Sequence, residues 1–213
     1  MSVAERLAAV RARIEQAGRD PDDVAIVAVT KGFGPEACSE AISAGLTMLG
    51  ENRVQEALAK MDAVTGGQWH LIGHLQSNKV RHAAGRFALI QSVDTVKLAE
   101  QIARTHPEQQ VLLEVNISRE EQKSGVPPDQ ALAVATAVAR LLDLRGLMGM
   151  GPTEGDPTRA FEELKRLRDE MEERVGKDLP ILSMGMSGDF EAALAAGSTM
   201  LRLGQVLFGP RPA

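Results

Sequence analysis

The chain is poor in the residues that several kinds of binding site require. Its 213 residues include one cysteine, Cys38, no tyrosine, and only 3% aromatic residues. A single cysteine excludes an internal disulfide and a zinc site built from several thiolates. So few aromatic side chains provide no stacking platform for single-stranded nucleic acid. The net charge is −5 and no stretch is strongly basic, so the composition gives no support to a nucleic-acid partner.

Long apolar runs are also missing. No run approaches the roughly 20 residues that cross a bilayer. The N-terminal segment mixes acidic with basic residues and lacks the apolar core of a secretory signal. We therefore expect a cytoplasmic protein without a membrane partner. Because 44% of the residues are hydrophobic and no linker or low-complexity tract interrupts the chain, we expect residues 1–213 to form a single domain.

Short apolar segments alternate with helical ones along the chain. Ser2 and Glu5 form a capping-box pattern that predicts a helix at the N-terminus. After it come eight near-continuous apolar runs, as expected for strands that are buried on both faces. They lie at residues 24–30, 47–50, 69–73, 87–93, 111–117, 144–150, 181–186 and 200–204.

This alternation predicts an α/β protein with a parallel sheet and right-handed crossovers. Eight units favour a single (β/α)8 TIM-type barrel with an extra N-terminal helix. An open Rossmann-like sheet is the alternative. However, no GxGxxG motif follows the first run, so the usual dinucleotide site of that fold is missing.

In such barrels the active site lies at the carboxyl ends of the strands, and phosphate commonly binds after strands 7 and 8. Ser187 and Gly188 follow the seventh run and lead into a predicted helix, whose first N–H groups are unpaired. Gly204 ends the eighth run, and Lys31 ends the first, its neighbour in a closed barrel. A partly buried lysine can attack an aldehyde. These positions suit a small phosphorylated aldehyde, although helix caps and a solvated lysine explain them equally simply.

Two further groups raise questions about charge and metal binding. Arg202 lies two residues before Gly204, so both face the same side of the strand. A buried charge needs a partner, which is either a pyridine nitrogen of a ligand or a carboxylate such as Glu51. His70 and His74 are four residues apart, but they lie on a strand and its end rather than on a helix. We therefore expect no metal site and interpret His70 as a hydrogen-bonded core residue.

Several motifs resemble the YggS/PROSC family of pyridoxal phosphate homeostasis proteins, which is similar in fold to the N-terminal barrel of alanine racemase. The resemblance runs in order from Val24 to Arg211. It is carried by AVTKG (28–32), LGENRVQEA (49–57), WHLIGHLQSNK (69–79), VNISREEQKSG (115–125), LRGLMGM (144–150), LSMGMS (182–187) and GSTMLRLGQVLFGPR (197–211).

The resemblance implies that pyridoxal 5′-phosphate is held as an imine on Lys31. It also implies phosphate contacts from Ser187 and from the backbone near Gly204 and Gln205. Arg202 would then face the pyridine nitrogen, and Asn52 would lie close to the ring. Two positions depart from the family pattern. The family often has Thr-Lys-Pro after the lysine, where this chain has residues 32–34 (Gly-Phe-Gly), and it usually has Thr where this chain has Gln205.

Three functions remain open at this point. The resemblance implies a non-catalytic carrier that buffers the cofactor and hands it to apo-enzymes. We expect a monomer. The second is a weak amino-acid racemase with one base. The two-base design of alanine racemase needs a tyrosine, and this chain has none. The third is a phosphate-binding barrel unrelated to this vitamin. Lys123 and Lys79 are either relay amines for release or ordinary surface lysines.

Overall fold

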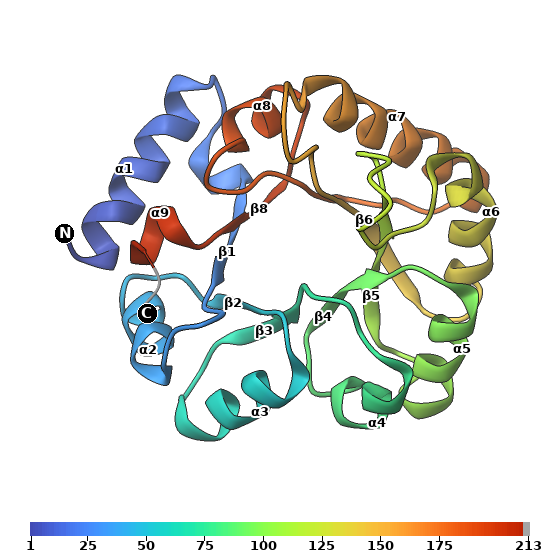
Figure 1. Ribbon diagram of the computed structural model, residues 1–213, viewed down its shortest axis with the longest axis horizontal. Helices are drawn as coiled ribbons and strands as arrows, with labels where there is room; N and C mark the ends of the chain where they lie inside the picture. The colour runs from blue at the N-terminus through green and yellow to red at the C-terminus, as the bar shows by residue number, and fades with distance from the viewer. Residues whose placement is uncertain (211–213) are drawn as a thin grey trace.

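The computed structural model describes residues 1–210 and contains a closed barrel of parallel strands (Figure 1). Each strand pairs with the next, and β8 pairs with β1 to close the ring. The predicted TIM-type barrel is confirmed, and the open-sheet alternative is wrong. Within residues 1–210 the strands are β1 (Ala25–Val29), β2 (Met48–Glu51), β3 (Gln68–Leu71), β4 (Leu89–Val93), β5 (Gln110–Val115), β6 (Asp143–Gly149), β7 (Ile181–Ser183) and β8 (Met200–Leu203).

Helices surround the barrel on its outside (Figure 1). The first of them precedes the barrel, and its capping box between Ser2 and Glu5 is present as predicted. The α-helices are α1 (Val3–Gln16), α2 (Pro35–Ser43), α3 (Val54–Ala63), α4 (Val80–Ala83), α5 (Val96–Thr105), α6 (Pro128–Ala139), α7 (Thr158–Val175), α8 (Phe190–Ala195) and α9 (Gln205–Phe208). No helix in this described part of the chain is long and apolar enough to span a bilayer.

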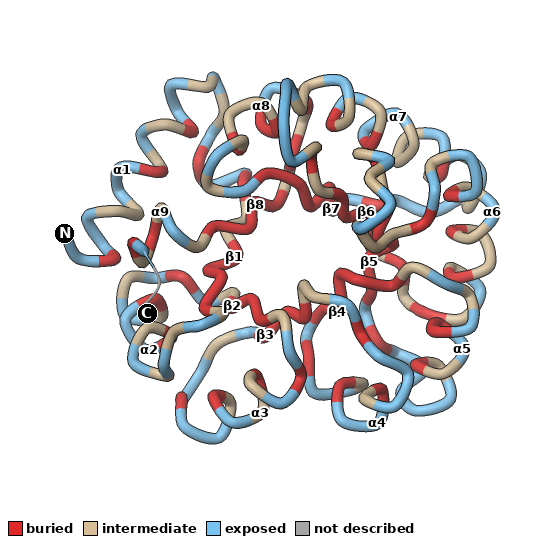
Figure 2. The backbone as a smooth tube through the Cα atoms, viewed as in Figure 1, coloured by how far each residue is buried: buried red, intermediate tan, exposed pale blue. Residues whose placement is uncertain are grey.

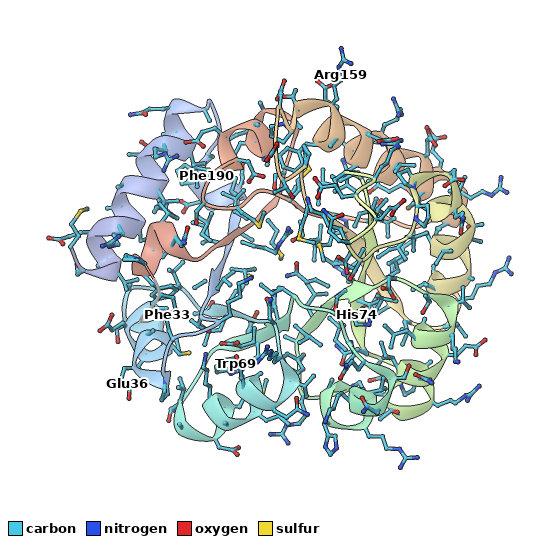
Figure 3. The ribbon with its side chains drawn as sticks, viewed as in Figure 1. Phe33, Glu36, Trp69, His74, Arg159 and Phe190 are labelled. Carbon is cyan, nitrogen blue, oxygen red and sulfur yellow. The ribbon has the colours of Figure 1, made fainter. Side chains whose placement is uncertain are left out.

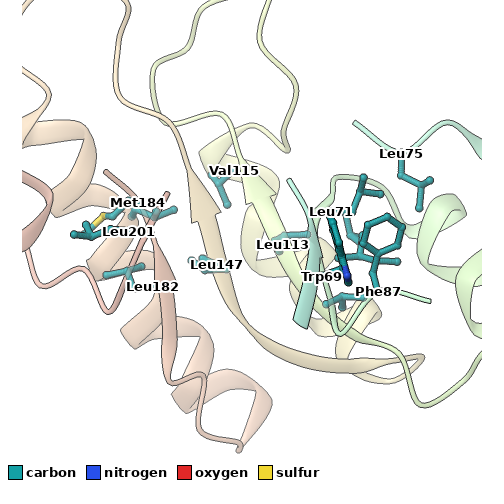
Figure 4. Close-up of a cluster of buried hydrophobic side chains, with 14 of the residues drawn as sticks. Trp69, Leu71, Leu75, Phe87, Leu113, Val115, Leu147, Leu182, Met184 and Leu201 are labelled. Atoms are coloured by element: carbon teal, nitrogen blue, oxygen red, sulfur yellow. The ribbon is translucent and has the colours of Figure 1, made fainter. Parts of the chain in front are cut away.

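The strands are apolar along their length because both of their faces are covered. Figure 2 shows the ring of strands as almost continuously buried. The outward-facing side chains pack against the helices and form the main core, part of which is drawn in Figure 4. The inward-facing side chains form a smaller apolar cluster inside the barrel: Val27, Leu89, Leu112, Met148 and Met200. This cluster fills the barrel below the ends of the strands, so any ligand must bind above it.

Two details after β7 and β8 differ from the sequence-based expectation. The helix after β7 begins at Phe190 with Asp189 as its N-cap residue, and the Asp189 carboxylate accepts a hydrogen bond at 2.6 Å from the N–H of Met186, which lies before the helix. The preceding residues, Ser187 and Gly188, therefore form a turn before the helix. The short helix α9 directly after Gly204 was not predicted. Arg211, the last residue of the final motif, lies outside the described residues.

Candidate functional site

One cavity of about 460 Å³ lies at the carboxyl ends of the strands. The barrel places side chains from distant parts of the chain around it. All seven residues that the sequence singled out for a ligand line this cavity: Lys31, Asn52, Ser187, Gly188, Arg202, Gly204 and Gln205. The structure thus brings the predicted residues together, although they are spread over more than 170 positions of the sequence.

Lys31 follows β1 and is half-buried at the cavity wall. The residue before it is fixed from behind. Thr30 Oγ1 donates a hydrogen bond to Glu51 Oε1 at 2.6 Å, and Lys60 Nζ donates to the Thr30 carbonyl oxygen at 2.8 Å. Lys60 also forms a buried ion pair with Glu51. This network ties the ends of β1 and β2 together outside the barrel and orients the backbone that carries Lys31.

Arg202 enters the cavity from β8 and is only 5% exposed. Its Nη1 donates to the carbonyl oxygen and the hydroxyl of Ser183, at 2.7 and 2.8 Å, and its Nη2 donates to the Gly149 carbonyl oxygen at 3.0 Å. Burial lowers the pKa of Arg202 to about 10. These three bonds use three of the five N–H donors of a guanidinium. Glu51 is not a partner of Arg202, because it pairs with Lys60; the carboxylates whose charges act on Arg202 are Glu114 and Asp189.

The hydrogen bonds of Arg202 continue as a polar layer across the barrel. Ser183 Oγ donates to Gln91 Oε1 at 2.7 Å, and Gln91 Nε2 lies 3.0 Å from His70 Nδ1. His70 is 3% exposed, and burial lowers its pKa to about 4. The neutral ring can therefore accept the bond from Gln91. The prediction that His70 is a hydrogen-bonded core residue is confirmed, and the layer as a whole fixes the guanidinium of Arg202.

The loops after β7 and β8 form a wall rich in backbone donors. Ser187 Oγ accepts a hydrogen bond from the Val206 N–H at 3.3 Å, which joins the β7 loop to the first turn of α9. Within residues 1–210, the N–H groups of Ser187 and Gly188 donate to no protein acceptor. A side chain at Gly188 would meet only open space, so a ligand can approach this backbone closely. An anion is the group that such donors attract.

Asn52 and Gln205 complete the rim of the cavity. Asn52 is half-buried after β2, and Gln205 is the exposed first residue of α9. Phe33 also lines the cavity, and its ring packs against Phe208 of α9 with 5.3 Å between the ring centroids. Figure 3 shows Phe33 beside α2 and His74, another lining residue, well apart from it near β4.

Sequence reasoning missed one buried group, Glu114 on β5. It lines the cavity and is 3% exposed. Burial raises its pKa to about 7; the nearby charge of Asp94 also raises it, and that of Arg202 lowers it. The sequence did contain a signal for Glu114, because it is the one acidic residue in the apolar run VLLEVNI (111–117). Arg202 was recognised in the same way, as a charged residue within an apolar strand.

The other candidates lie away from this cavity or have other partners. Lys123 Nζ donates to the Gly151 carbonyl oxygen at 2.7 Å and pairs with Glu120 at 2.8 Å. Lys79 lies in a neighbouring depression that shares Asn52 and His74 with the cavity. Among residues 1–210, no group of three or more histidine, cysteine, aspartate or glutamate side chains could hold a metal ion.

Comparison with known proteins gives one consistent result. Residues 6–212 match the family of the alanine racemase N-terminal domain. A pyridoxal phosphate homeostasis protein of Aquifex aeolicus is 39% identical, with 99% of each chain covered. A protein of the same description from Pseudomonas aeruginosa is 40% identical over 99% of this chain and 96% of its own. The structure of PipY from Synechococcus elongatus with PLP bound has a TM-score of 0.86 and 34% identity, covering 98% of this chain and all of that one.

Proposed function

The chain belongs to the family of pyridoxal phosphate homeostasis proteins, which share the alanine racemase N-terminal domain, and from this membership we propose that it binds pyridoxal 5′-phosphate as a carrier. The observation that carries the proposal is the convergence of all seven predicted residues on one cavity. A lysine, a buried guanidinium and a set of unpaired backbone donors meet there, as a phosphorylated pyridine aldehyde requires.

The residues present fit this cofactor group by group. Ser187, with the N–H groups of the β7 loop and of the first turn of α9, would hold the phosphate. Arg202 keeps N–H donors beyond its three protein bonds, and one of them would face the pyridine nitrogen. Asn52 would lie close to the ring. When bound, the cofactor would supply an aldehyde that condenses with the amine of Lys31. An arginine at the ring nitrogen keeps that nitrogen unprotonated, which weakens the ring as an electron sink.

That electronic effect and the composition of the chain favour a carrier over a racemase. A two-base racemase of the alanine racemase type needs a tyrosine opposite the lysine, and the sequence has none. A racemase with Lys31 as its one base is the alternative. Racemisation of alanine or serine by the purified protein, lost in Lys31→Ala, would support that alternative instead.

The test is the absorption spectrum of the purified protein mixed with pyridoxal 5′-phosphate. We expect a visible imine band that borohydride removes, with the reduced adduct found by mass spectrometry on the peptide containing Lys31. Lys31→Ala should show no band. Lys79→Ala, which removes a neighbouring lysine, is the matched control and should keep it. If the wild-type protein forms no band, or Lys31→Ala keeps an equal one, the proposed cofactor site is wrong.

We propose further that the protein acts as a cytoplasmic monomer and delivers the cofactor to apo-enzymes. Light scattering of the loaded protein tests the monomer, and reactivation of an apo-enzyme by the loaded protein tests delivery. The two partners of Lys123 Nζ, Gly151 and Glu120, favour a structural role for this lysine. Lys123→Ala should therefore leave the rate of delivery unchanged, and a slower rate would support the relay hypothesis.

A further inference from the structure

The cavity has a second wall to which the proposed cofactor contacts assign no role. Those contacts come from residues after β1, β2 and β7 and from residues on or directly after β8. The remaining lining residues after or on β3 to β6 include His74, Glu114 and Ser124. Because β5 is four strands from β1 in either direction around the barrel, Glu114 faces the cavity from the side opposite Lys31.

Glu114 is directed inward by the alternation of the strand. Leu112, two residues earlier, belongs to the apolar cluster inside the barrel, so Glu114 lies on the same face one layer higher. Within residues 1–210 no side chain or backbone group donates a hydrogen bond to its carboxylate, and no cation lies within ion-pair distance. Arg202 bonds to Ser183 and Gly149 instead.

The carboxylate of Glu114 opens onto the cavity with only 3% of the residue exposed, and a charge so poorly solvated is costly unless a ligand supplies a positively charged donor. The negative charge of a neighbouring residue adds to this cost. Asp94 stands near Glu114, with its Oδ2 3.4 Å from Nδ1 of His74, and its charge raises the pKa of Glu114 in addition to the effect of burial. The wall therefore favours cations and disfavours a second carboxylate.

We propose that Glu114 binds the ammonium group of a small amine that enters the loaded cavity, so that amines with a second cationic group are preferred over α-amino acids. This inference rests on the proposed function, because the amine is the group that replaces Lys31 on the cofactor. In that exchange a carbon–nitrogen bond forms to the neutral nitrogen of the incoming amine, and the bond to Lys31 Nζ breaks. The incoming nitrogen loses two protons when it becomes the imine nitrogen, and the nitrogen of Lys31 gains two when it becomes a free amine, so the exchange needs no other reactant.

The same wall should make an α-amino acid a poor ligand. Its carboxylate would enter a cavity that already holds the carboxylate of Glu114 with Asp94 behind it. A diamine offers one neutral nitrogen for the exchange and one ammonium for Glu114. The subsite thus selects for release of the cofactor to cationic amines and against the substrates of a racemase.

The experiment follows the loss of the imine band after loaded protein is mixed with 1,4-diaminobutane, butylamine or alanine at equal concentrations of neutral amine. In the wild-type protein the diamine should act about tenfold faster than butylamine, as expected for a hydrogen bond to a charged group, and alanine should be slowest. Glu114→Gln keeps the shape of the side chain and should remove the preference for the diamine. Glu121→Gln makes the same change of charge on an exposed residue nearby and should keep it.

A second measurement does not depend on the cofactor. The melting temperature of the unloaded protein should rise with 1,4-diaminobutane more than with butylamine, because a ligand that binds only the native state stabilises it. Glu114→Gln should abolish the difference, and Glu114→Asp should retain part of it. If the wild-type protein forms no imine band, the proposed function fails, but this measurement still tests the ammonium subsite.

Two results would overturn the inference. One is an unchanged preference for the diamine in Glu114→Gln, together with an unchanged rise in melting temperature. The other is a loss of cofactor affinity in Glu114→Gln with the amine preference intact, which would make Glu114 only a counter-charge for Arg202.

Discussion

The two walls of the cavity offer opposite chemistry to a ligand. The wall after β7 and β8 presents backbone N–H groups and the hydroxyl of Ser187, which suit an anion. The wall around β5 presents the buried carboxylate of Glu114, which suits a cation. Arg202 lies between them, fixed by the polar layer that runs through Ser183. The comparison teaches that one small cavity can suit both an anionic phosphate and a cationic ammonium group, provided that a fixed cation separates the two walls.

The largest effect is expected where the two walls meet. Arg202→Leu removes three hydrogen bonds inside the barrel and takes the neighbouring positive charge away from Glu114. We expect the free energy of unfolding to fall by about 3–5 kcal/mol, the range seen when one partner of a buried charged network is removed. Urea denaturation of the unloaded protein measures this loss.

Arg202→Lys separates charge from hydrogen bonding in this comparison. The lysine keeps the positive charge but cannot reproduce the planar fork of donors, so we expect a smaller loss of stability than in Arg202→Leu. Equal stability of Arg202→Leu and wild-type protein would show that the polar layer does not hold the two walls together.

The next effect concerns pH and belongs to the wall around β5. The pKa of Glu114 is raised from 4.5 to about 7, so between these values the native protein holds a proton that the unfolded chain has lost. The free energy of unfolding contributed by Glu114 is therefore greatest below pH 4.5 and falls by about 3 kcal/mol as the pH rises to 7. Glu114→Gln should remove this contribution to the pH dependence of stability, as measured by denaturation at a series of pH values.

His70, in the polar layer below, has the opposite dependence. Its pKa is lowered from 6.5 to about 4, so the unfolded chain gains a proton in this range before the native protein does. Its contribution is complete above pH 6.5 and is lost as the pH falls to 4. The contributions of Glu114 and His70 to the pH dependence of stability should nearly cancel in the wild-type protein. Stability should then rise with pH in Glu114→Gln and fall with pH in His70→Gln. Parallel curves for both variants would contradict this account.

The sequence predicted one wall far better than the other, and the reason is local geometry. Turns that expose backbone donors need glycine and serine next to each other along the chain, so Ser187 and Gly188 could be recognised after a strand. The carboxylate of Glu114 becomes important only through neighbours from other strands. Its signal was nevertheless present, because a charged residue within an apolar strand must face the cavity or have a buried partner.

Two other features of the structure, the partner of Glu51 and the helix α9, also could not be predicted from the sequence. Glu51 was a candidate partner for Arg202, but strand alternation places it on the face opposite to that of Asn52, where Lys60 of α3 meets it. That partner comes from a helix, and sequence patterns do not reveal which helix residue covers which strand. The helix α9 has only four residues, too few to show a helical period.

A smaller effect is expected from the hydroxyl on the wall after β7. Ser187→Ala removes the proposed donor to the phosphate and the acceptor of the Val206 N–H, while the backbone N–H groups remain. We expect the affinity for pyridoxal 5′-phosphate to fall about tenfold, the effect of one hydrogen bond to a charged group. Equilibrium titration of the imine band measures it. The amine preference set by Glu114 should not change, and a change in both properties would show that the two walls are not independent.

The smallest expected effect comes from the aromatic contact between Phe33 and Phe208. This contact joins the loop that carries Lys31 to α9, so it holds together two segments that the cofactor would bridge. Phe33→Ala should reduce cofactor affinity by about 1 kcal/mol, the usual value of an aromatic pair, because the ligand must then order these segments itself. Phe33→Leu keeps most of the apolar contact and should lose less. Phe33 belongs to the wall of Lys31 and α9, so the diamine preference should stay at its wild-type value in Phe33→Ala. If this variant lost the preference, the selectivity would come from the shape of the cavity rather than from the charge of Glu114.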